Sequence, residues 1–167
     1  VVYGENGTGV LRSRTRTNTS GAWSAEGNGS TTATTVAFTI THASPQDDEF
    51  ITASKNNTTL YVSRYNGAWN LDITQADIGD STTLRNFDLA YEKNTGNALV
   101  AYGNGGTSNE ISYYYYVATS SSWIGPCTLE LSGTAAAVEW VRLAARPDSD
   151  ELAMAGSESG NNVTAMI

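Results

Sequence analysis

The sequence contains very little cysteine and few charged residues. A single cysteine, Cys127, occurs in 167 residues, so no disulfide can form within the chain, and stability has to come from packing and strand pairing. Only 16% of the residues are Lys, Arg, Asp or Glu. Thr, Ser, Asn and Gly fill most polar positions, which is typical of strands and turns rather than of helix surfaces. We therefore expect an all-β protein in which helix is scarce.

Basic charge and long apolar runs are scarce too. The net charge is −8, whereas nucleic-acid binding depends on many Lys and Arg contacts to phosphates. Arg12, Arg14 and Arg16 alternate and would share one solvated face of a strand. No apolar run reaches the roughly 18 residues that a membrane span needs, and the first residues lack a signal-peptide pattern. We expect no nucleic-acid partner and no membrane insertion, with any secretion signal or anchor outside this segment.

The abundant Asn, Ser and Thr create several N-glycosylation acceptor patterns. The candidate acceptors are Asn6, Asn18, Asn28, Asn56, Asn57 and Asn162. Such matches arise easily in a chain of this composition, so glycosylation itself stays open. Together with the composition, they favour an extracellular or cell-surface location.

Internal repeats organise the chain. We align Phe87–Tyr102 with Trp140–Ala155, and Phe38–Ala53 matches the latter segment without a gap. Between these copies, a tryptophan follows a short polar stretch at Trp23, Trp69 and Trp123, at intervals of 46 and 54 residues. Repeats of this length are found in four-stranded propeller blades.

Each repeat divides into four short alternating segments separated by turn residues. In the clearest repeat we expect strands over 84–92, 97–103, 111–118 and 123–131. Short turns make such strands antiparallel neighbours, and a four-stranded meander that buries both faces against its neighbours is a propeller blade. We predict a β-propeller of four-stranded antiparallel blades, with about three-and-a-half blades in this chain.

The predicted boundaries divide the chain into four parts. They are the end of one blade (1–35, strands two to four), two whole blades (36–83 and 84–137) and an incomplete blade (138–167). Because neither end of the chain falls on a blade boundary, we expect either further blades of a parent chain or subunits that complete one another. Open strand edges favour self-association.

Two types of repeat alternate at an interval of about 100 residues. One carries Phe87-Asp88-Leu89-Ala90-Tyr91-Glu92, and the other carries Trp140-Val141-Arg142-Leu143-Ala144-Ala145-Arg146-Pro147. This alternation resembles the repeats of large uncharacterised secreted or surface-attached proteins of prokaryotes, most specifically at 84–103 and 138–157. The resemblance implies an extracellular repeat propeller and no established activity.

Aromatic residues supply the candidate ligand contacts. Tyr113 to Tyr116 form a run in which two rings face each side of a strand. Stacking against neighbouring blades explains them adequately. The alternative is glycan binding, and the residues that we assign to it are Trp69, Tyr114, Tyr116 and Trp123.

Acidic turns raise the question of a metal site. Carboxylates in the turns 47–49 and 148–151 could bind calcium. Asp and Asn also stabilise tight turns through their own backbone, and the third copy places Asn94-Thr95-Gly96-Asn97 there. Turn chemistry is the better interpretation, and we predict no metal and no cofactor.

No catalytic set stands out. His42 is the only histidine, without an identifiable nucleophile beside it. Asp88, Glu92, Glu139 and Arg142 could serve a sialidase-like or glycosidase propeller, but the turn motif that often marks sialidase blades is missing. We therefore expect a non-enzymatic module of cell-surface structure or adhesion that self-assembles or binds glycans. The alternatives are a fragment of a carbohydrate-active propeller enzyme and a subunit of an extracellular filament.

Overall fold

The computed structural model is built of short strands. It describes residues 1–4, 11–16, 20–29, 36–79, 83–131, 136–159 and 163–167. In these ranges the strands form four antiparallel sheets, and one short 3₁₀ turn (Ala118–Ser120) is present. Among the same residues, no helix has the length and apolarity that a membrane span requires. The all-β class with little helix is confirmed.

Each sheet takes consecutive strands of the chain, in order. The first sheet contains β1 (Val2–Gly4), β2 (Leu11–Ser13) and β3 (Gly27–Asn28). The second contains β4 (Phe38–Ala43), β5 (Phe50–Asn56), β6 (Thr59–Tyr65) and β7 (Trp69–Gln75). The third contains β8 (Phe87–Tyr91), β9 (Ala98–Gly103), β10 (Ile111–Val117) and β11 (Ser122–Leu129). The fourth contains β12 (Val138–Ala145), β13 (Leu152–Glu158) and β14 (Val163–Met166).

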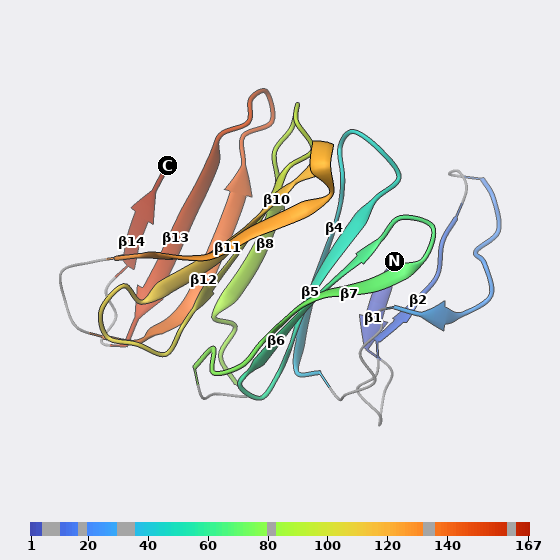
Figure 1. The fold of residues 1–167 in the computed structure, drawn as a ribbon. Coiled ribbons are helices and arrows are strands. Elements are labelled where there is room, and N and C mark those ends of the chain that lie inside the picture. The colour runs from blue at the N-terminus through green and yellow to red at the C-terminus, as the bar shows by residue number, and fades with distance from the viewer. Residues whose placement is uncertain (5–10, 17–19, 30–35, 80–82, 132–135, 160–162) are drawn as a thin grey trace.

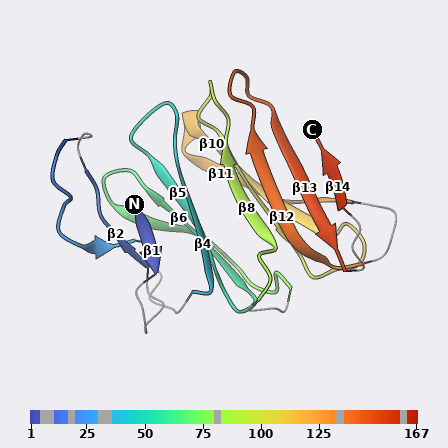
Figure 2. The ribbon, with the colours of Figure 1, turned by 180° about the vertical axis from the view of Figure 1, so that it is seen from behind.

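The sheets stand side by side in chain order (Figure 1). The first strands of the last three sheets, β4, β8 and β12, are neighbours, and β8 contacts both of the others. Figure 2 shows these three strands in a row from behind. The second and third sheets therefore each pack one face against the preceding sheet and the other face against the following one.

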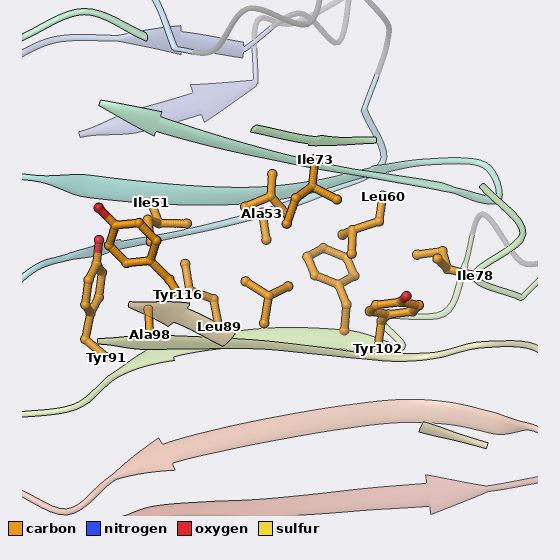
Figure 3. Packing of buried hydrophobic residues seen from close by; sticks show 13 residues of the cluster. Ile51, Ala53, Leu60, Ile73, Ile78, Leu89, Tyr91, Ala98, Tyr102 and Tyr116 are labelled. Atoms are coloured by element: carbon orange, nitrogen blue, oxygen red, sulfur yellow. The ribbon is translucent and has the colours of Figure 1, made fainter. Parts of the chain in front are cut away.

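An apolar core joins the second and third sheets (Figure 3). Ile51, Ala53 and Leu60 from the second sheet meet Leu89 and Val100 from the third, and all five are fully buried. The contacting residues alternate along their strands because successive side chains point to opposite faces. Burying a Leu, Ile or Val side chain stabilises a fold by about 1.5–3 kcal/mol, so this contact is a major source of stability.

A second apolar core joins the third and fourth sheets. It uses the opposite face of the third sheet, with Ala90, Ala101 and Ile111, against Val141 and Leu143 of the fourth. The third sheet is therefore apolar on both faces. This double burial explains the short continuous apolar stretches of its strands in the sequence.

The turns after β4, β8 and β12 set a common register for the repeats. In each turn a backbone N–H bonds to a carbonyl five residues later, from Ser44 to Glu49, Glu92 to Asn97 and Arg146 to Glu151. Counting from these bonds, residues of different sheets are called equivalent when they lie equally far from the turn. The alignment of Phe38–Ala53 with Trp140–Ala155 is confirmed.

The alignment of Phe87 with Trp140 is wrong by one residue. In the common register Phe87 is equivalent to Val141, and Asn86 is equivalent to Trp140. A slip of one residue moves a side chain to the other face of a sheet. Phe87 and Val141 are both fully buried, whereas Trp140 is 40% exposed. Matching the two aromatic residues therefore paired Phe87 with Trp140 instead of with Val141.

Candidate functional site

A hollow of about 470 Å³ lies between the first and second sheets, and we call it the aromatic hollow. Its lining comes from β1 to β3 and adjoining residues on one side and from β4, β5, β6, the β6–β7 turn and the start of β7 on the other. The residues are Val1, Val2, Ser13, Arg14, Thr15, Ser24, Ala25, Gly27, Asn28, Thr41, Phe50, Tyr65, Gly67, Ala68 and Trp69. One side is aromatic and the other mainly polar.

The aromatic wall consists of Phe50, Tyr65 and Trp69. Phe50 pairs with Tyr65 across β5 and β6, and Tyr65 pairs with Trp69 across β6 and β7. Directly paired residues point to the same face of a sheet. The ring centroids are 6.1 Å apart for the first pair and 5.4 Å apart for the second. The wall is thus a ladder of three half-exposed rings on three adjacent strands.

The opposite wall offers hydroxyl and amide groups. The Trp69 indole N–H donates to Ser13 Oγ at 3.4 Å, and Ser13 Oγ donates to the carbonyl of Asn28 at 2.6 Å. On the aromatic side, the hydroxyl oxygens of Thr41 in β4 and Thr52 in β5 lie 2.9 Å apart. Small-molecule sites are typically lined by aromatic and apolar side chains with a few fixed polar groups.

An equivalent aromatic pair occupies the next interface, between the second and third sheets. Tyr116 is equivalent to Tyr65, and its partner Trp123 is equivalent to Trp69. The two rings lie 5.1 Å apart. Tyr116 is buried, and the Arg64 guanidinium lies 5.3 Å from its ring centroid. This pair is therefore covered by a side chain of the preceding sheet.

Ionic and hydrogen-bonding groups complete that cover. Arg64 pairs with Asp72 at 2.8 Å and with Glu49 at 3.2 Å, and Trp123 donates to Asp72 at 2.9 Å. Burial alone would lower the pKa of Arg64, but the two carboxylates raise it overall. We call this contact between the second and third sheets, formed by Glu49, Arg64, Asp72, Tyr116 and Trp123, the closed contact.

Two tyrosine hydroxyls share the Glu49 carboxylate. Tyr116 donates to it at 2.9 Å and Tyr91 at 3.4 Å, and Figure 3 shows the two hydroxyl ends side by side. Burial, reinforced by Glu49, raises the pKa of both tyrosines. Glu49 is 8% exposed, so its hydrogen bonds are what offset the cost of burying a carboxylate.

The structure separates the four residues that we assigned to glycan contacts. Trp69 lines the aromatic hollow, whereas Tyr116 and Trp123 meet in the closed contact. Tyr114 stacks on Tyr102 with centroids 6.1 Å apart and donates to Gln75 at 2.9 Å, also between the second and third sheets. Tyr114, Tyr116 and Trp123 thus all contact residues of the second sheet.

Sequence reasoning missed Phe50 and Tyr65. A signal for Tyr65 was present, because Tyr65 and Trp69 flank the turn Asn66-Gly67-Ala68 and residues flanking a short hairpin turn face each other. Phe50 gave no such signal, since its place beside Tyr65 depends on the register of β5 against β6.

The acidic turns stabilise themselves and join neighbouring sheets. Asp47 accepts the backbone N–H of Glu49 at 2.9 Å. Asp150 accepts the backbone N–H groups of Asn94 at 2.6 Å and Thr95 at 3.3 Å, across to the third sheet. Among the described residues no group of three or more His, Cys, Asp or Glu side chains is placed to hold a metal ion.

The carboxylates considered for catalysis have structural partners. Buried Asp88 accepts the N–H groups of Leu89 and Leu143, both at 2.9 Å. It also pairs with Arg85 at 3.0 Å and Arg142 at 3.6 Å. The contact with Leu143 ties β8 to the edge of β12.

The other two carboxylates lie apart from this contact. Glu92 accepts hydrogen bonds from Tyr115 at 2.8 Å and Asn97 at 3.0 Å, within the third sheet. Glu139 is half-buried on β12, and His42 is exposed on β4. Cys127 is a free, half-buried thiol opposite Tyr113.

The candidate glycosylation sites differ in exposure. Asn28 and Asn57 are exposed, the latter in a turn with φ of 52°, and Asn56 is half-buried. Asn6, Asn18 and Asn162 lie outside the described residues.

In comparisons with known proteins, no protein-family model, no curated protein and no solved structure matches the chain.

Proposed function

We propose that the four sheets are consecutive blades of a β-propeller and that the protein is a non-enzymatic extracellular module of cell-surface structure or adhesion that binds carbohydrate in the aromatic hollow. Support for the propeller comes from sheets that follow one another in chain order, with β4, β8 and β12 adjacent. Repeats of about fifty residues agree with that arrangement.

The ladder of Phe50, Tyr65 and Trp69 facing a hydroxyl-bearing wall is the observation that carries the binding proposal. The C–H faces of a sugar ring are apolar and pack on aromatic rings, while its hydroxyls need donors and acceptors at the edge. Ser13, Asn28 and Thr41 supply such groups. A volume of about 470 Å³ suits a ligand of one or two sugar rings.

The charge balance of the hollow favours a neutral sugar. Arg14 is the charged side chain of its lining, and its guanidinium lies 3.9 Å from the Glu26 carboxylate. The arginine is therefore partly neutralised and offers weak attraction to an anion. An uncharged oligosaccharide needs no compensating cation in this place.

The test begins with a printed array of neutral and acidic oligosaccharides, followed by titration calorimetry of the best binders. Trp69→Ala should weaken binding of a neutral sugar by at least about tenfold, the effect of losing about 1.4 kcal/mol. Trp23→Ala is the matched control, because Trp23 lies outside the hollow and is 50% exposed. Failure of every oligosaccharide to bind, or equal affinity for both variants, would overturn the binding proposal.

Self-assembly is a second candidate, favoured by the composition of one strand. The outermost strands β7 and β11 carry features that protect edges, namely Asp72, Pro126 and a register irregularity in each. β14 consists of Val163-Thr164-Ala165-Met166 and has neither charge nor proline. Light scattering across a concentration series should show association that Thr164→Lys suppresses, and a monomer at all concentrations would exclude it.

A further inference from the structure

The chain concentrates basic residues beside β4, β8 and β12. Its net charge is −8, yet four of its nine Lys and Arg residues and its only histidine lie on or next to these three strands. They are His42 in β4, Arg85 before β8, Lys93 after it, Arg142 in β12 and Arg146 after it. Because the whole chain is acidic, its overall composition does not account for a cluster of basic groups in one place.

A second hollow, which we call the basic hollow, lies at the turn ends of the same strands. It measures about 440 Å³ and draws its lining from the second, third and fourth sheets. The residues are His42, Ala43, Pro45, Ala90, Tyr91, Lys93, Leu143, Ala144, Ala145, Arg146 and Pro147. It shares no residue with the aromatic hollow.

Short side chains at a repeated position leave this space open. His42, Ala90 and Ala144 are equivalent residues of three consecutive sheets, each two residues before the N–H donor of its turn. The alanines belong to the Leu89-Ala90 and Leu143-Ala144 pairs that recur in the two repeat types. Where the second sheet carries an imidazole, the next two sheets carry only methyl groups. These form an apolar floor, of which Ala144 is exposed and Ala90 is buried at 2% exposure.

The basic groups differ in how far their charge is already neutralised. Arg146 pairs with Asp148 at 2.8 Å and with Glu151 at 2.6 Å. Arg85 and Arg142 share the single buried carboxylate of Asp88. Lys93 is exposed and has no ion pair within the described part of the chain. The hollow therefore has a surplus of positive charge at Lys93.

Two further observations concern the charge near the basic hollow, although Arg85 is not part of its lining. The buried Arg85 Nε–H has no hydrogen-bond acceptor among the described residues. The pKa of His42 is lowered because neighbouring groups partly desolvate the imidazole; Asp88 opposes that shift, and Arg142 and Arg85 add to it. The positive potential of the two arginines thus reaches the imidazole, whose neutral form offers one N–H donor.

We propose that the basic hollow binds a small organic carboxylate, with the charged group between Lys93 and His42 and the apolar part against Ala144. An ammonium and an imidazole N–H both donate to carboxylate oxygens, and bonds to a charged acceptor are the stronger ones. The apolar floor gives an aliphatic acid an advantage over an inorganic anion. This site is independent of the sugar site, so either can fail alone.

The experiment follows backbone amide signals by NMR while propionate, its uncharged amide propionamide, or sulfate is added to the whole chain. Propionate should saturate with shifts confined to residues around His42, Ala90 and Ala144, and propionamide should not bind. Lys93→Gln should weaken propionate binding by about tenfold. Ala144→Leu should abolish it by filling the hollow, because Ala144 is exposed and the change leaves the core intact.

Arg16→Gln is the matched control, since Arg16 is an exposed cation outside this hollow. It should leave propionate binding unchanged. Equal affinity for propionate and sulfate, unchanged binding by Lys93→Gln, or binding that survives Ala144→Leu would each overturn the proposal. Glucuronate, tested last, distinguishes an acidic sugar from a simple aliphatic acid as the preferred carboxylate.

Discussion

The two faces of the second sheet meet their neighbours in different ways. Toward the third sheet, an apolar core and an ionic cluster close the contact. Toward the first sheet, Thr41 and Thr52 stand where their equivalents in the third sheet are Leu89 and Val100. The same backbone repeat thus presents hydroxyls in one interface and aliphatic groups in the next. The shared strand register determines which face of its sheet a side chain occupies. The chemistry of that side chain determines whether the two sheets pack closely there.

One position explains much of the difference at the aromatic pairs. Arg64, which covers Tyr116, pairs with Asn70, the residue after Trp69. In the first sheet the residue after Trp23 is Ser24, and its N–H bonds to Thr15. Thr15 therefore takes the place of Arg64 and lines the aromatic hollow. A threonine is too short to cover Tyr65 as the arginine covers Tyr116.

Removing the arginine should have the largest effect. Arg64→Ala leaves Glu49 and Asp72 buried without their cation, and breaking such a pair costs about 3–5 kcal/mol of unfolding free energy. Urea unfolding measures the loss. Arg146→Ala is the control, because Arg146 pairs with two exposed carboxylates and exposed pairs contribute about 0–1 kcal/mol. Equal losses in the two variants would contradict the closed contact.

The next largest difference in unfolding free energy should come from substitutions at equivalent positions in the two interfaces. Leu89→Ala removes a fully buried side chain and should cost about 2–5 kcal/mol. Thr41→Ala removes a half-buried hydroxyl that forms a hydrogen bond with Thr52, and should cost about 1 kcal/mol. Thermal and urea unfolding of the pair provide the comparison. A larger loss from Thr41→Ala would mean that the interface with the first sheet is the tighter one.

Closing the aromatic hollow should separate binding from stability. Thr15→Arg introduces at the first sheet the side chain that covers the second aromatic pair. We expect sugar affinity to fall by about tenfold or more, while unfolding free energy changes by about 0.5 kcal/mol, as for other exposed positions. Thr15→Ser is the conservative control and should bind as the natural chain does. Undiminished binding by Thr15→Arg would place the sugar elsewhere.

The smallest effect concerns alkaline pH. Burial and the hydrogen bond to Glu92 raise the pKa of Tyr115 to about 12, and burial raises the pKa of Tyr91 and Tyr116. The unfolded chain loses these protons first, near pH 10, so stability is full below pH 10 and falls as pH rises through the folded values. Phenolate absorbance during a pH titration should rise together with unfolding. Ionisation of all tyrosines near pH 10 without unfolding would contradict it.

The sequence allowed much of the strand pattern to be predicted, because it depends on local alternation and turn residues. The expected strands 97–103 and 111–118 are found as Ala98–Gly103 and Ile111–Val117. The pairing of consecutive strands followed from short turns between them.

The contacts between sheets could not be predicted in the same way. Glu49, Arg64 and Asp72 meet Trp123 only because the second and third sheets pack face to face, and no spacing in the sequence encodes that meeting. The aromatic match of Phe87 with Trp140 failed for a related reason, since aromatic residues can occupy either face of a strand and the turn register decides which one.

The most direct measurement is fluorescence quenching of single-tryptophan variants. One variant keeps only Trp69 and the other only Trp123, with the remaining tryptophans replaced by phenylalanine. We expect acrylamide to quench Trp69 readily and a neutral sugar found on the array to protect it, whereas Trp123 should be shielded with or without the sugar. Equal quenching of the two, unchanged by the sugar, would contradict the distinction between an open and a closed interface.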